Sequence, residues 1–179
     1  ATVGAHVYPT RSIKTVPVRA LPFGAGVSGA ESVDGFWSVE GGFIPHKQLI
    51  AHDDVEKDAA ATALRFLGVP YLWGGDSNFG IDCSGLVHIA LRMAGLDCPR
   101  DSDQQEVFFD SVPEGQALRR NDLVFWKGHV GMMVDGETIV HANGHHMATT
   151  VEPLALVAQR IIEAEGKEVS GRARPILST

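Results

Sequence analysis

The sequence predicts an α+β protein in which a small all-β segment precedes a larger domain of helices followed by strands. The chain has 179 residues, 44% of them hydrophobic and 21% charged, which is enough for one ordinary domain or two small ones. Its 20 glycines and 9 prolines favour short strands over a helix bundle. From residue 122 the apolar spacing changes from helical to alternating.

Composition and charge exclude several classes of protein. The 22 acidic and 15 basic side chains give a net charge of −7, and the basic residues are scattered, so nucleic acid is not an expected partner. No apolar run approaches the roughly 20 residues that span a bilayer, so no membrane partner is expected. The chain starts at Ala1 rather than Met, and we expect a processed or trimmed product whose compartment stays open, cytoplasmic or periplasmic and wall-associated.

Residues 1–50 are predicted to form one domain and residues 51–179 another. A strand over Phe36–Val39, a turn at Gly41-Gly42 and a returning strand at Phe43-Ile44 make a hairpin. The letters GFW and GGFIP of this hairpin resemble bacterial SH3-like domains found beside cell-wall hydrolases. That resemblance implies a small SH3-like β-barrel, and an unrelated all-β lid is the alternative.

Helical spacing indicates the first elements of the second domain. Ala60, Leu64 and Leu67 recur on one helix face after a stretch rich in Asp, which favours helix N-termini. A second helix is expected from Cys83 to Gly95, with a buried apolar face. The spacing Ser102-x-x-Gln105 is a capping box and predicts a third helix. A fully antiparallel meander of strands should follow over residues 122–153.

Cys83 is the residue best placed for chemistry. It stands between a glycine-rich turn and an amphipathic helix, and a helix N-terminus lowers the pKa of a thiol. His129 begins a predicted strand and His141 lies on the next one. A thiol, a histidine base and a group that orients the histidine make a cysteine nucleophile. The alternative is that Cys83 is simply a small buried side chain.

Several motifs in register give this interpretation more weight. The segments PYLWGGDSNFGIDCSGLV, PRDSDQQ, LRRNDLVFWKGHVGMMV and IVHANGHH together resemble the NlpC/P60 family of cell-wall cysteine peptidases, over roughly residues 58–150. The resemblance implies a papain-like core with Cys83 as nucleophile, His129 as base and His141 as orienter. It implies no cofactor. The resemblance is greatest to γ-D-glutamyl-L-diamino-acid dipeptidyl peptidases, which act on peptidoglycan stem peptides.

The resemblance also assigns residues around the substrate. Tyr71 and Trp73 match positions that border it, and the Tyr71 hydroxyl could join the Cys83 N–H in stabilising an oxyanion. Asp82 and Ser102 match residues that hold a free amino-terminal L-Ala, because a carboxylate and a hydroxyl can replace the solvation of an ammonium group. We expect Ser84 to bind substrate as well.

Four of these residues also have a structural alternative. The role of Asp82 could be limited to capping the helix that follows it, and the role of Ser102 to opening the capping box. Tyr71 and Trp73 could be core aromatics.

Other side chains that could bind metal or react have plainer explanations. His88 is expected to be structural, and Cys98 has no evident helper. His141, His145 and His146 could suggest a metal, but no cysteine or carboxylate set completes a site, so none is predicted.

Two rival functions remain for the whole chain. One is a non-catalytic module that holds peptidoglycan, which has no need of the three residues Cys83, His129 and His141. The other is an acyltransferase on the same fold, a class that usually carries a membrane anchor. Dipeptidyl-peptidase relatives often carry a further SH3-like domain upstream, and only one fits in residues 1–50.

The turn between the two histidines has a geometric requirement. Directly opposed residues of a hairpin share a face, so His129 and His141 are opposed only if residues 134–136 form the loop. That loop type places Gly136 where a positive φ is needed. We therefore predict a positive φ at Gly136 and neighbouring histidine rings on the face toward Cys83.

Overall fold

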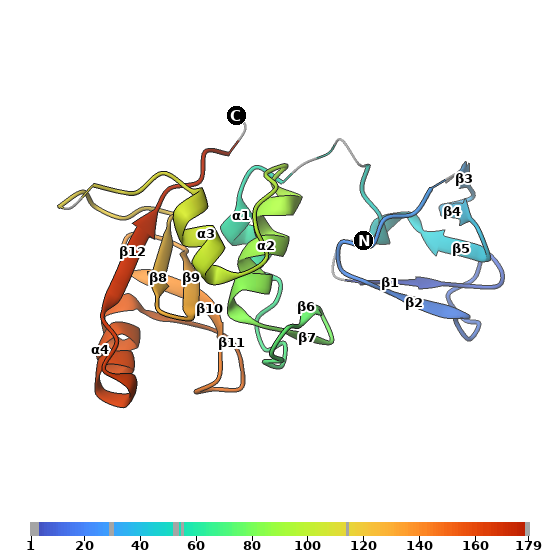
Figure 1. Ribbon diagram of the computed structural model, residues 1–179. Helices are drawn as coiled ribbons and strands as arrows, with labels where there is room; N and C mark the ends of the chain where they lie inside the picture. The colour runs from blue at the N-terminus through green and yellow to red at the C-terminus, as the bar shows by residue number, and fades with distance from the viewer. Residues whose placement is uncertain (1–3, 29–30, 52–53, 55, 114, 178–179) are drawn as a thin grey trace. The chain divides into compact units, whose positions relative to one another are not determined.

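The computed structural model describes residues 4–28, 31–51, 54, 56–113 and 115–177 of the chain. The chain folds into two compact units, residues 1–54 and residues 55–179 (Figure 1). Each unit has its own strands and its own buried side chains, so each is described by itself.

The N-terminal unit consists of short strands and one 3-10 turn. The strands are β1 (Gly4–Val7), β2 (Arg19–Pro22), β3 (Glu31–Val33), β4 (Phe36–Val39) and β5 (Gly42–Pro45), followed by η1 (His46–Gln48). β1 pairs with β2, and β3, β4 and β5 form a second sheet. Ala5, Val7 and Ile44 are at most 1% exposed and form the core.

The predicted hairpin is present, but the predicted closed barrel is not shown. Val39 pairs with Gly42, so the turn is at residues 40–41, one residue earlier than expected. Gly42 instead begins β5, where a Cβ would collide with the Tyr8 carbonyl oxygen. Among the described residues the two sheets are joined by the bridge between Tyr8 and Phe43 and do not close into a barrel.

The C-terminal unit is an α+β structure built on a five-stranded antiparallel sheet (Figure 1). The order across the sheet is β11-β10-β9-β8-β12. Its strands are β8 (Leu123–Trp126), β9 (His129–Met133), β10 (Thr138–Asn143), β11 (Ala148–Pro153) and β12 (Val169–Ala173). A separate small hairpin joins β6 (Asp76–Ser77) to β7 (Gly80–Ile81). The four-strand meander matches the expectation, and β12 extends it at the β8 edge.

Helices α1 (Ala59–Leu64) and α2 (Cys83–Met93) both contact β9 and β10. Asp58 caps α1, because its side chain accepts the Ala61 N–H. The apolar face predicted for α2 is buried: Leu86, Val87, Ala90 and Leu91 are at most 1% exposed. In the described part of the chain, no helix is long and apolar enough to cross a membrane.

Helix α3 (Ser102–Phe108) begins as predicted but without the capping box. Asp101 occupies the cap position and its side chain makes no capping hydrogen bond. The Gln105 side chain does not turn back to the helix start. Its amide donates instead to the carbonyls of Ser84 and Pro99, at 3.1 and 2.9 Å. Gln105 therefore connects α3 to the start of α2 through hydrogen bonds.

Helix α4 (Leu154–Glu165), which follows β11 directly, was not predicted from the sequence. Val157 of α4 is fully buried against Val124, Trp126 and Met133 of the sheet. Gly166 ends the helix with a φ of 66°, the left-handed conformation that glycine accommodates. This helix therefore covers the sheet face formed by alternate residues of β8 and β9.

The predicted turn between β9 and β10 is wrong. Met133 pairs with Ile139 and Met132 with Val140, so the register is shifted by two residues from the expected one. Gly136 is not among the residues with positive φ. The Asp135 carboxylate closes the loop instead, accepting the N–H groups of Glu137 and Thr138 at 2.8 and 2.7 Å. The Asp135 side chain thus stabilises the turn that was expected to depend on a glycine with positive φ.

Candidate active site

Cys83 is the first residue of α2, as predicted. Asp82 caps the helix by accepting the Gly85 N–H at 2.8 Å. The cysteine is only 5% exposed. Its thiol lies beside β9, where the backbone N–H of Val130 favours the thiolate.

The pKa of Cys83 is nevertheless raised, which corrects the expected lowering. Burial is the largest cause, and the nearby Asp82 carboxylate also raises it. The N–H groups of Val130 and Ser84 oppose this shift without reversing it. Desolvation outweighs the helix terminus, so the resting group is a thiol.

The rings of His129 and His141 are neighbours, as expected. By strand alternation the two residues share the face of Met133 and Ile139, which α4 covers, rather than being shown on a face toward Cys83. The His129 Nε2 is 2.8 Å from the His141 Nδ1, and the rings meet at 66°. The shifted register keeps them on one face because a two-residue shift preserves the alternation of side chains. Gly131 lies two residues after His129 on β9, and a Cβ at this position would come within 3.1 Å of the His141 Cβ. The absence of a side chain there permits the close contact.

Both histidines resist protonation. Burial and the neighbouring His141 lower the pKa of His129 to about 3. Burial also lowers the pKa of His141, although its bond to Glu152 opposes the shift. In the described part of the chain no hydrogen bond joins the Cys83 sulfur to His129. Such bonds often shorten only when substrate is bound. In the resting state the Cys83 thiol and the His129 imidazole are therefore both neutral.

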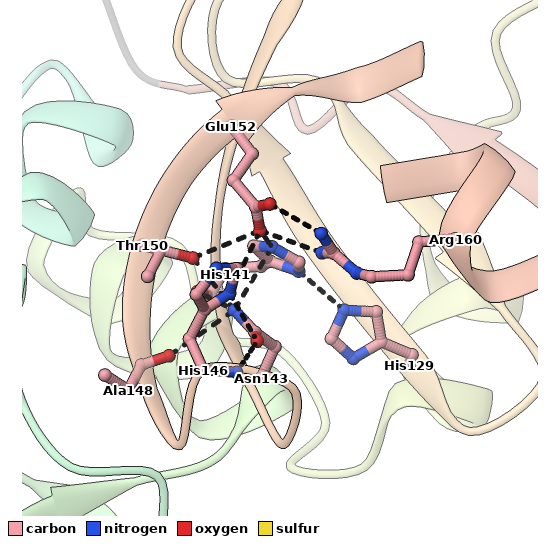
Figure 2. Close-up of polar contacts among 8 residues, drawn as sticks. All are labelled: His129, His141, Asn143, His146, Ala148, Thr150, Glu152 and Arg160. Atoms are coloured by element: carbon pink, nitrogen blue, oxygen red, sulfur yellow. Dashed lines mark hydrogen bonds and ion pairs between the residues drawn. The ribbon is translucent and has the colours of Figure 1, made fainter. Parts of the chain in front are cut away.

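A carboxylate and a guanidinium that were not predicted from the sequence complete the polar cluster (Figure 2). Glu152 of β11 accepts from the His141 Nε2 at 2.8 Å. Arg160 of α4 forms two hydrogen bonds to the Glu152 carboxylate, at 2.7 and 2.9 Å. The alternation TTVEP could have placed Glu152 on the face of the histidines, but nothing in the sequence indicated Arg160.

A cleft of about 440 Å³ runs along this cluster. Its lining includes both histidines, Tyr71, Trp73 and several residues of α4. Trp73 is 80% exposed, so it is not a core aromatic. The Tyr71 hydroxyl has a raised pKa because of burial and then the nearby Cys83 and Asp82. The structure therefore places Tyr71 near Cys83 and Trp73 at the rim of the cleft.

Asp82 has more partners than the sequence indicated. Its Oδ1 lies 2.9 Å from the Arg100 guanidinium, and its Oδ2 accepts the Gly74 N–H at 2.7 Å. Arg100 also donates to the Ser84 hydroxyl at 2.9 Å. Ser102 is partly exposed at the start of α3. The carboxylate is therefore already paired with a cation.

The remaining histidines and the second cysteine have structural surroundings. The His88 Nδ1 is 3.0 Å from the Cys98 carbonyl oxygen, in agreement with a structural role. Burial raises the pKa of Cys98 to about 11. The rings of His145 and His146 are in edge contact, and His146 lies 3.5 Å from the carboxylate that His141 binds.

Comparison with known proteins identifies the family. The family model described as NlpC/P60 family matches residues 68–165, more than half of the chain. This chain belongs to the NlpC/P60 family, a family of peptidoglycan hydrolases. The matched range includes Cys83, His129 and His141, and also Glu152 and Arg160.

Two relatives carry the same enzyme name. The γ-D-glutamyl-L-lysine dipeptidyl-peptidase of Bacillus subtilis is 38% identical over 94 residues, 48% of this chain and 31% of the relative. That of Bacillus cereus is 34% identical over 105 residues, 54% of this chain and 31% of the relative. The chain thus matches about a third of the length of each relative.

Solved structures share the fold. An NlpC/P60 family protein from Bacillus cereus has a TM-score of 0.76 at 24% identity, covering 97% of this chain and 60% of that one. RipD of Mycobacterium tuberculosis, a non-catalytic NlpC/P60 domain protein adapted to peptidoglycan binding, has a TM-score of 0.52 at 24% identity. It covers 66% of this chain and 95% of that one. The fold alone therefore does not decide between catalysis and binding.

Proposed function

We propose that the chain is a cysteine peptidase that hydrolyses the bond between γ-D-glutamate and the following diamino acid in peptidoglycan stem peptides. The observation that carries the proposal is Cys83 at the start of α2, beside the strand that begins with the paired histidine His129. Family membership supports peptidoglycan chemistry, and the names of the two relatives support this bond.

The reaction follows from a neutral thiol and a neutral imidazole. The Cys83 sulfur attacks the γ-carbonyl carbon while its proton passes to His129. The carbon–nitrogen bond then breaks, and His129 returns the proton to the leaving amine. The product is a thioester acyl-enzyme. Water, deprotonated by His129, attacks the thioester, and the released sulfur recovers a proton.

Charge develops on the carbonyl oxygen in the first step. The backbone N–H of Cys83 at the helix terminus and the Tyr71 hydroxyl are the donors we assign to it. The proximity of Tyr71 to Cys83 supports this role. Trp73, exposed at the cleft, would contact the peptide.

Lys127 offers positive charge to an anionic peptide in the cleft. The other two cations of the lining are already paired, Arg160 with Glu152 and Lys167 with Glu165. A γ-linked glutamate keeps a free α-carboxylate, and meso-diaminopimelate carries one more than L-Lys. Both diamino acids remain within the proposal.

A free amino-terminal L-Ala remains the preferred peptide end in this proposal. Asp82 and Ser102 would bind its ammonium group, and Ser84 would be a further substrate-binding residue. Because Arg100 already pairs with Asp82, the free acceptor capacity is at Oδ2. We therefore expect a roughly tenfold advantage in kcat/KM over an N-acetylated peptide, about 1.4 kcal/mol.

Defined tripeptides test the function directly. L-Ala-γ-D-Glu-meso-diaminopimelate and its L-Lys counterpart are each incubated with the chain and with the C83S variant. Release of L-Ala-γ-D-Glu by the unmodified chain alone supports the proposal. Binding without cleavage would favour the peptidoglycan-binding rival. Transfer of an acyl group to an added amine, without hydrolysis, would favour the acyltransferase.

We further propose that residues 1–50 are an SH3-like accessory domain and residues 51–179 the catalytic domain. The β4–β5 hairpin and the likeness to a solved structure over 97% of this chain support that division. An NMR structure of the full chain tests it: additional strand pairing that joins the two N-terminal sheets is expected, and sheets that share no further pairing would contradict it.

A further inference from the structure

Glu152 and Arg160 extend the chain of hydrogen bonds that runs from His129 through His141 (Figure 2). Their side chains are only 14% and 24% exposed. Arg160 engages both carboxylate oxygens, and one of these oxygens also accepts from His141. The bond to His141 suggests a role beyond holding α4 against β11.

The proton positions follow from which groups are charged. The Arg160 guanidinium holds the pKa of Glu152 at about 2, so its carboxylate has no proton to donate. The proton in the bond of 2.8 Å between Glu152 and His141 therefore belongs to the His141 Nε2. A neutral His141 then has an unprotonated Nδ1.

That unprotonated nitrogen determines the tautomer of the other ring. The His141 Nδ1 lies 2.8 Å from the His129 Nε2, which must donate to it. A neutral His129 with its proton on Nε2 has a lone pair on Nδ1. One fixed carboxylate thus determines the tautomers of two histidines in sequence.

Asn143 does not compete for the same proton. Its Nδ2 lies 3.2 Å from the His141 Nε2, but its Oδ1 accepts the His146 N–H at 2.8 Å, which fixes the amide. The Nδ2 is therefore a donor, and Thr150 accepts from it at 2.9 Å. Two donors do not hydrogen-bond each other, so the His141 proton points to Glu152.

We propose that Glu152, held by Arg160, is a positioning residue that fixes the tautomers of His141 and His129 and so presents the His129 Nδ1 as the base. The catalytic consequence rests on the proposed function, whereas the tautomers themselves do not. In a Ser-His-Asp triad, the wrong histidine tautomer lowers kcat by about 10⁴. Loss of the Glu152 acceptor is expected to lower kcat by about 10² to 10⁴ with little change in KM.

Three substitutions separate this role from a structural one. E152M keeps the length of the side chain and removes the acceptor. E152Q keeps one acceptor oxygen and is expected to recover at least tenfold of the lost kcat. R160M removes the guanidinium that holds Glu152 but leaves a carboxylate beside His141, so its kcat should fall by less than about tenfold. The matched control is E163M on α4, whose carboxylate accepts from Gln159 on the exposed helix face and should leave kcat unchanged.

Nitrogen-15 NMR of the histidine rings in the full chain reports the tautomer without any substrate. The proposal expects His129 and His141 each protonated on Nε2 at pH 7, and a mixture of tautomers in E152M. Protonation of His129 on Nδ1 in the unmodified chain would overturn it, even if E152M fails to fold. A folded E152M with unchanged tautomers and kcat within threefold would overturn it as well. Absence of peptidase activity in the unmodified chain would instead contradict the proposed function, and the NMR result would stand by itself.

Discussion

The resting state of Cys83 determines how its reactivity should depend on pH. Burial raises the pKa of the thiol above its ordinary value of about 8.5, so less than about 3% is thiolate at pH 7. Each lower pH unit reduces that fraction tenfold. The rate of alkylation by iodoacetamide should therefore rise by about 100-fold from pH 6 to pH 8.

The assay uses the C98A variant, so that Cys83 is the cysteine modified. Cys98, with a pKa of about 11, should react more slowly near neutral pH and is measured in C83A. A preformed thiolate–imidazolium pair would react at nearly the same rate from pH 5 to pH 8. Such a plateau would refute the neutral resting pair.

Activity and stability should show the same protonation behaviour of His129. Because the pKa of His129 is lowered to about 3, the acid limb of kcat/KM should lie well below pH 6.5. The unfolded chain takes up the same proton at about pH 6.5, so protonation favours unfolding and stability is lost as the pH falls below that value. The melting temperature should decline less between pH 7 and pH 5 in H129Q than in the unmodified chain. An equal decline would contradict the lowered pKa.

Three further substitutions test other parts of the structure. R100M leaves the buried Asp82 without its cation and should destabilise by about 2 kcal/mol in urea unfolding. This is less than the loss of about 3–5 kcal/mol for a fully buried pair, because Arg100 is 30% exposed. R11M, which removes the cation of an exposed pair, is the control. Equal losses of stability in R100M and R11M would contradict the argument. G131A places a methyl group 2.5 Å from Ile139 and 3.1 Å from the His141 Cβ, so kcat should fall by at least about tenfold. G26A, with open space around it, should leave kcat unchanged, and an active G131A would show that the histidine contact is not tight. D135A should lower the melting temperature more than G136A does, because the carboxylate rather than the glycine closes the turn; the reverse order would contradict this assignment.

Local patterns predicted the elements that carry the proposed nucleophile and base. The helix beginning at Cys83 follows from its apolar spacing, and the strands of His129 and His141 follow from alternation. The neighbouring histidines were predicted through a specific turn that proved wrong. Their shared face survived because it depends only on whether the register shift is even.

What could not be predicted depends on contacts between distant segments. The partnership of Arg100 with Asp82 and that of Arg160 with Glu152 need the folded arrangement of α2, α4 and the sheet. The direction of the Cys83 pKa shift was also misjudged, because a helix terminus is visible in a sequence whereas burial of the thiol is not.

The central claim, that Cys83 forms a thioester with the γ-carbonyl of D-glutamate, is tested most directly by acid quenching, followed by mass spectrometry of the intact chain and of its acid-protease digest. The chain is mixed with L-Ala-γ-D-Glu-meso-diaminopimelate and stopped within the first turnover. We predict a mass increase equal to an L-Ala-γ-D-Glu acyl group on the peptide containing Cys83, removable by hydroxylamine and absent from C83S. Dipeptide release at full rate with no such adduct on Cys83, or release by C83S, would contradict the claim.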